Sequence, residues 1–77
     1  MRSLAGSHLG EVSKIEEEVA ELRDAHTQGV DILELCELSD LVGAIRGYLR
    51  KRFPGMGMQD LIDMADVTER AFQAGDR

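Results

Sequence analysis

Hydrophobic and polar residues alternate along the first third of the chain with the period of an amphipathic helix. The apolar residues recur every three or four positions, as Ile15, Val19 and Leu22. "SKIE" at 13–16 matches a capping box, in which Ser13 caps the first amides and Glu16 reaches back to the cap. Gly29 suits the left-handed conformation that often ends a helix. The pattern predicts a helix over residues 14–27.

Two further helices follow from the same kind of pattern. Asp31 and Glu34 resemble a second capping signal, and no proline follows until Pro54, which predicts a helix over 32–52. After the "FPGMG" break at 53–57, a third apolar stripe predicts a helix over 58–74, consisting of Leu61, Met64, Ala65, Thr68, Ala71 and Phe72. Gly75 closes this helix.

The fold class that we expect is therefore all-α, with a helical hairpin and a C-terminal helix in one domain over residues 1–77. Residues 1–10 show no clear helical period, which leaves residues 1–12 as an arm, either ordered or frayed. No strand pattern, internal repeat or low-complexity segment is present in the sequence.

The helix predicted over 32–52 carries two packing faces. One is apolar and consists of Leu35, Leu38, Val42, Ile45 and Leu49; the other consists of the small residues Cys36, Ser39, Gly43 and Gly47. Small residues let another helix approach closely, although glycines are also tolerated in helices without such a role. Two packing faces in a short chain predict a helical bundle shared between subunits, as a homodimer or homotetramer.

Composition and charge limit the classes of partner that the chain is expected to bind. The chain has 9 basic and 15 acidic residues and a net charge of −6, which argues against binding a nucleic-acid backbone. No apolar run approaches the roughly 18 residues of a membrane span, and the start resembles no secretory signal. A single cysteine, Cys36, permits no internal disulfide. We therefore expect no membrane partner and a cytoplasmic location.

Four acidic residues form two pairs with matched spacing. Glu18 and Glu21 lie three residues apart on the first helix, as do Glu37 and Asp40 on the second. The short "QGV" connection at 28–30 favours antiparallel packing, which would bring the two pairs together. Carboxylates that converge repel one another unless they stay hydrated or bind a cation. Oxygen ligands of this kind suit Mg²⁺ or Mn²⁺.

The four acids also carry a resemblance to a known family. The pattern E-x-x-E, a spacer, then E-x-x-D in "KIEEEVAELRDA…ELCELSDLVGAI" resembles the all-α nucleoside triphosphate pyrophosphohydrolases over about residues 14–50. This superfamily includes MazG-like proteins, dimeric dUTPases and phosphoribosyl-ATP pyrophosphohydrolases. The resemblance implies that Glu18, Glu21, Glu37 and Asp40 bind Mg²⁺ and are catalytic, releasing pyrophosphate and a nucleoside monophosphate.

The residues that would bind the nucleotide are less clear in the sequence. Lys14 lies one turn before Glu18 on the same side and is the first candidate for a phosphate ligand. Lys51 lies about 16 Å from Asp40 along the helix, so it would reach only a long substrate or a partner's site. Tyr48 is placed to stack on a base, or to pack in a core or an interface. A protein that binds a nucleotide or mediates assembly without turnover is the alternative function.

Overall fold

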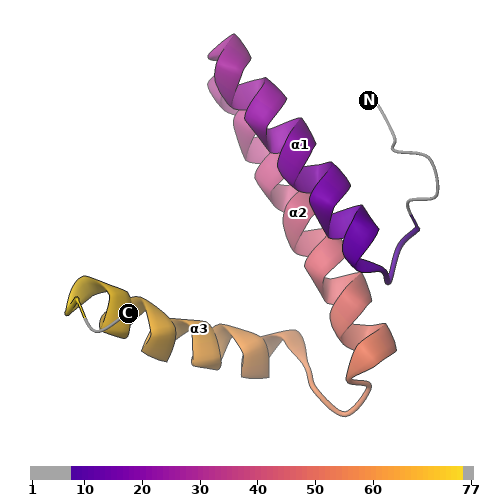
Figure 1. Cartoon of the computed structure of the whole chain (residues 1–77), viewed down its shortest axis with the longest axis vertical. Helices are drawn as coiled ribbons and strands as arrows, with labels where there is room; N and C mark the ends of the chain where they lie inside the picture. The colour runs from indigo at the N-terminus through magenta and orange to yellow at the C-terminus, as the bar shows by residue number, and fades with distance from the viewer. Residues whose placement is uncertain (1–7, 76–77) are drawn as a thin grey trace.

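The computed structural model consists of three helices, and it describes residues 8–75. Helix α1 covers Val12–Gln28, α2 covers Asp31–Arg52 and α3 covers Met58–Gln73. Figure 1 shows α1 and α2 side by side as an antiparallel hairpin, while α3 runs away from the far end of α2. The all-α fold is confirmed. Most of the arm expected over 1–12 lies outside the described residues.

The helix ends agree with the sequence at some positions and differ at others. Gly29 ends α1 with a φ of 72°, and its N–H donates to the carbonyls of Ala25 and His26 at 3.2 and 3.1 Å. The predicted cap at Ser13 is wrong, since Glu11 precedes the helix and the Ser13 hydroxyl donates to the Glu11 carboxylate at 3.4 Å. Local motifs therefore located this helix within two residues.

The starts of the other two helices need similar corrections. Asp31 lies inside α2 rather than capping it, and Glu34 bonds instead to His26, with 3.2 Å between the His26 Nδ1 and the carboxylate. At the start of α3, the sequence interpretation missed a cap: the Gly57 N–H donates to the Asp60 carboxylate at 2.9 Å. A carboxylate at this position satisfies an amide that the helix leaves without a partner.

The buried face of the hairpin includes Leu49 but not most of the apolar stripes that we expected. Ala25 and Ala44 are almost completely buried, and their small side chains allow the helices to lie close together. Val19 of the predicted stripe is 45% exposed, as is Val42 on α2. The apolar stripes thus lie beside the α1–α2 contact and remain open to solvent over part of their length.

Gly43 and Gly47 have different surroundings on α2. A Cβ at Gly47 would lie 2.9 Å from the Cγ of Leu9, because the segment before α1 packs directly over this glycine. A Cβ at Gly43 would have no heavy atom within 4 Å. The close approach expected at the small-residue strip is therefore found at Gly47, where it is made by the chain's own Leu9.

We expect Gly43→Ala to stabilise the protein by roughly 0.5–1 kcal/mol, since glycine weakens a helix relative to alanine. Gly47→Ala should give a smaller gain or a loss because it displaces Leu9. Urea unfolding of the two variants measures both free energies, and each substitution serves as the control for the other. Equal gains at the two positions would contradict the packing of Leu9 over Gly47.

Helix α3 is amphipathic but lies apart from the hairpin. Its apolar side chains include Ile62, Met64 and Val67, all of which are largely exposed. Within residues 8–75, no helix combines the length and the apolar content needed to cross a lipid bilayer. The hairpin therefore forms the packed part of the chain, and α3 presents an apolar surface that its own hairpin does not cover.

Candidate metal centre

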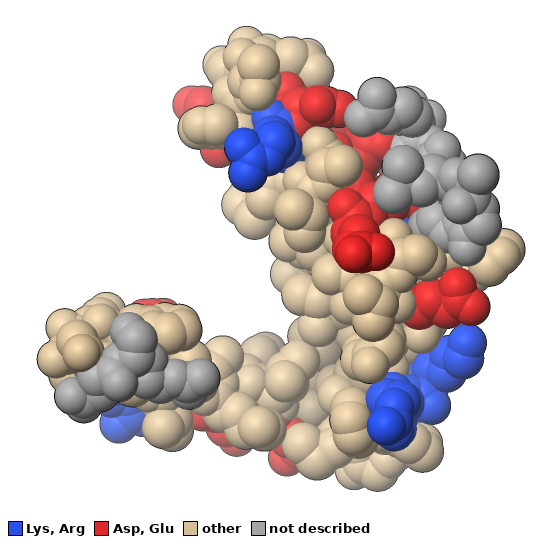
Figure 2. Space-filling view, in the orientation of Figure 1, with Lys and Arg blue, Asp and Glu red and all other residues tan. Residues whose placement is uncertain are grey.

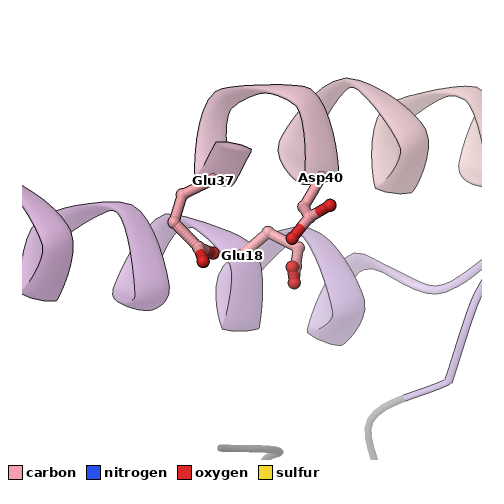
Figure 3. A group of neighbouring side chains, drawn as sticks. All are labelled: Glu18, Glu37 and Asp40. Carbon is pink, nitrogen blue, oxygen red and sulfur yellow. The ribbon is translucent and has the colours of Figure 1, made fainter. Parts of the chain in front are cut away.

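Three of the four predicted acids meet between α1 and α2. Glu18 of α1 and Glu37 and Asp40 of α2 each place a carboxylate oxygen within 4.8 Å of the other two. Figure 3 shows Glu37 and Asp40 projecting from one helix toward Glu18 on the other. The i, i+3 spacing on α2 aims both side chains in one direction, and the antiparallel hairpin brings Glu18 opposite them.

Two of these carboxylates are buried in an unusual way. Glu18 is 2% exposed and Glu37 is 8% exposed, whereas Asp40 is exposed. The Oε2 atoms of Glu18 and Glu37 are both shielded from solvent, and neither has a hydrogen-bond partner among the described residues. A buried polar atom without a partner is costly, and buried charges are normally paired or bound to a metal.

The electrostatics of the cluster match this burial. Burial raises the pKa of Glu18, the Lys14 ammonium opposes this effect, and the nearby carboxylates, including Asp40, add to it. Burial also raises the pKa of Glu37, and the negative charges of Asp40 and Glu21 contribute further. Both carboxyl groups are therefore harder to ionise than ordinary glutamates when no metal ion is bound, even with the Lys14 ammonium nearby.

An open hollow of about 370 Å³ adjoins the cluster. It is lined by residues of both helices and of the segment before α1, namely Leu9, Lys14, Glu18, Ser39, Asp40, Gly43 and Ala44. Because Gly43 has no side chain, the floor of the hollow stays open next to Asp40. The hollow thus gives a molecule in solution access to Glu18, Asp40 and Lys14 together.

Glu17 is a buried acid that sequence reasoning missed. It is 2% exposed, and its Oε2 lies 3.4 Å from the Lys14 Nζ. Lys14, Glu17, Glu18 and Glu21 follow the i, i+3, i+4, i+7 spacing of one helix face, which would have identified Glu17 as inward-facing. Glu17 holds the Lys14 ammonium beside the cluster.

The remaining predicted site residues lie around the cluster or away from it. Glu21 is half-buried and acts on Glu37 through its charge, but it is not one of the three acids that meet within 4.8 Å. Lys51 lies outside the hollow, with its Nζ 4.0 Å from a Glu11 carboxylate oxygen. Tyr48 is half-buried on α2. Only Lys14 among the predicted nucleotide ligands lines the hollow.

The chemistry of the three acids fits a hard divalent cation. They supply only oxygen donors, at least two of them unpartnered and buried, within a span that one ion can bridge. Mg²⁺ and Mn²⁺ prefer such ligands, and Mg²⁺ usually keeps several water molecules, which the open hollow accommodates. Glu18, Glu37 and Asp40 would hold the ion, while Glu21 adds negative charge nearby.

The metal-free protein is expected to become more stable as the pH falls from neutral toward 4.5, the ordinary pKa of a glutamate. Because Glu18 and Glu37 have pKa values raised above 4.5, the folded chain binds more protons than the unfolded chain between the two values. The free energy of unfolding should therefore decrease as the pH rises through this window. Below the unfolded pKa, the destabilisation due to these two groups should be absent.

Urea unfolding at several pH values with a chelator present measures this dependence. Glu37→Gln removes one of the two titrating groups, so its stability should vary less with pH than that of the unmodified protein. Identical pH profiles for the two proteins would show that the Glu37 carboxyl ionises as easily in the folded chain as in the unfolded chain.

Figure 2 shows patches of acidic side chains along the hairpin on a mainly uncharged surface, and Lys and Arg side chains nearer its two ends. Comparisons of the chain with protein-family models, with curated proteins and with solved structures find no match. Indications of its function therefore come from the geometry of the site and from the resemblance in the E-x-x-E and E-x-x-D motifs.

Proposed function

We propose that this protein is a Mg²⁺-dependent nucleoside triphosphate pyrophosphohydrolase related to the MazG-like proteins. The observation that carries the proposal is the convergence of Glu18, Glu37 and Asp40 within 4.8 Å, with unpartnered buried oxygens on both glutamates. The motif resemblance assigns metal binding to these same residues. A structural role alone would require the glutamates to be hydrogen-bonded, because unpaired buried carboxylates destabilise a fold.

In this proposal, different side chains of the site bind the cation and the phosphate chain. Glu18, Glu37 and Asp40 hold the cation, which when bound neutralises phosphoryl charge and lowers the pKa of water. Lys14 binds the phosphate chain, because its ammonium reaches the same hollow as Glu18 and Asp40. Asp40 is exposed, so solvent and substrate reach it first.

The proposed reaction is hydrolysis at the α-phosphorus. Water adds to this phosphorus, the bond to the bridging oxygen breaks, and pyrophosphate leaves with that oxygen. The proton lost by the water passes to a carboxylate of the cluster, which acts as the general base. The other product is a nucleoside monophosphate. In this reaction the protein contributes mainly positioning and charge stabilisation.

Pyrophosphate release from a panel of nucleoside triphosphates, measured with Mg²⁺ and with a chelator, tests the proposal. We expect release from at least one nucleotide and none in the chelator. Binding of metal and nucleotide without release would identify a nucleotide-sequestering protein instead. Absence of both metal binding and nucleotide binding would exclude the hydrolase and the nucleotide-sequestering protein.

A further inference from the structure

Helix α3 presents an apolar face that its own hairpin leaves open. This face forms a shallow hollow of about 460 Å³, lined by Leu61, Met64, Ala65, Thr68, Glu69 and Phe72. Met64 is 57% exposed. Figures 1 and 2 show that α3 points away from the hairpin, with open space between them. An amphipathic helix is stabilised mainly by burying its apolar face, so we expect another molecule to cover this surface.

The hairpin has an open groove of its own on the side away from the acids. The groove also measures about 460 Å³ and is lined by Val19, Leu22, Arg23, His26, Glu34 and Leu38. The exposed side chains of Leu35 and Val42 extend its apolar surface along α2. Leu38 and Asp40 differ by about 200° around α2, so the groove and the acidic hollow open on opposite sides.

The exposed surface of the chain is large enough to include an interface with a second copy. The chain exposes 5748 Å², about 1,100 Å² more than the roughly 4,650 Å² of a compact monomer of 8.5 kDa. Its radius of gyration of 14.1 Å likewise exceeds the roughly 11.5 Å of a compact chain of this length. A standard interface buries about 800 Å² on each partner, which this excess covers.

The two surfaces also complement each other in length and charge. Helix α3 has 16 residues and α1 has 17, so α3 extends along most of the hairpin. Glu69 lines the α3 face, whereas Arg23 lines the groove, in which His26 is paired with Glu34 at 3.2 Å. An amphipathic helix in an apolar groove with opposite charges at the edge is a common mode of recognition.

We propose that α3 of one copy docks in the α1–α2 groove of a second copy, and that the exchange is reciprocal. A two-fold dimer of this kind buries both apolar surfaces on both chains. The Glu69 carboxylate of each copy then lies near Arg23 of the other. The acidic hollows remain open on the opposite sides of the hairpins, so the proposal does not depend on the proposed function.

Light scattering after size-exclusion chromatography tests the association. At micromolar concentration we expect a mass twice the 8.5 kDa of the chain. Met64→Glu places a charge in the buried face and should weaken the dimer by at least about tenfold. Gln73→Glu adds the same charge to the exposed end of α3, where it should leave the mass unchanged. Leu38→Glu in the groove should act like Met64→Glu.

A charge exchange between two variants tests the pairing itself. Glu69→Arg and Arg23→Glu should each weaken the homodimer by roughly tenfold. In a homodimer of either variant, residues 69 and 23 carry the same charge, and they meet in both of the symmetric interfaces. Mixing the two variants should restore the dimer, since both interfaces of a mixed pair join opposite charges. Intermolecular crosslinking or native mass spectrometry of the mixture would detect this heterodimer.

Several results would overturn the proposal. A monomeric unmodified protein would mean that α3 has no partner copy, and circular dichroism would show whether every variant remains helical. A dimer that survives both Met64→Glu and Leu38→Glu would place the interface elsewhere. A mixture that fails to form heterodimers would exclude the Glu69–Arg23 pairing. Pyrophosphate release, measured on the same samples, reports on the acidic site separately.

Discussion

Replacing Glu37 by glutamine is expected to reduce metal-dependent turnover by roughly 100-fold or more, since it removes one of the carboxylates that would hold the cation. The same substitution should abolish most of the stabilisation by Mg²⁺ or Mn²⁺. In the unmodified protein, an ion at 100 times its dissociation constant should add about 2.7 kcal/mol to the free energy of unfolding. Thermal unfolding with and without metal measures this difference.

The metal-free Glu37→Gln protein should be no less stable than the unmodified one, and it should gain stability near neutral pH. Burial and the charges of Asp40 and Glu21 raise the pKa of Glu37, so its ionised form is unfavourable in the folded chain. A neutral amide of the same shape removes this repulsion. Asp40→Asn should act in the same direction.

Glu16→Gln is the matched control for these substitutions. Glu16 is an exposed acid of α1 outside the cluster, so its amide changes the net charge equally without changing the site. Loss of stability in metal-free Glu37→Gln would indicate a structural carboxylate with hydrogen bonds of its own. If saturating Mg²⁺ and Mn²⁺ changed neither the melting temperature nor nucleotide binding in the unmodified protein, the metal site would not exist.

Replacing Lys14 by glutamine is the second substitution expected to have a large effect. Lys14 is the one predicted phosphate ligand that lines the hollow with Glu18 and Asp40. Loss of a charge-assisted hydrogen bond to phosphate should raise KM for the triphosphate by roughly tenfold or more. Steady-state kinetics at saturating Mg²⁺ would measure this change, with a smaller effect expected on kcat.

Lys14→Gln should also destabilise the metal-free protein. Its ammonium lies 3.4 Å from Glu17 and lowers the pKa of Glu18, so its removal leaves the buried acids to repel one another. Lys51→Gln is the comparison, because Lys51 lies near Glu11 and outside the hollow. A larger rise in KM for Lys51→Gln than for Lys14→Gln would place the phosphates outside the hollow, nearer the end of α2 and Glu11.

Much of the architecture was predictable from short-range pattern. The three helices, the Gly29 turn and the antiparallel hairpin depend on helical periodicity, on glycine at a left-handed position and on a short connection. The capping predictions at Ser13 and Asp31 were wrong, because a motif of four residues does not determine which residue begins the helix.

The sequence by itself determined that Glu37 and Asp40 point the same way, since residues three apart on a helix share a face. Only the tertiary structure decided that Glu18 joins them and that Glu21 lies outside the three-acid group. The rotation of each helix about its axis set these relations. That rotation buries Ala25 of α1 and Ala44 of α2, two small residues that an apolar stripe does not reveal.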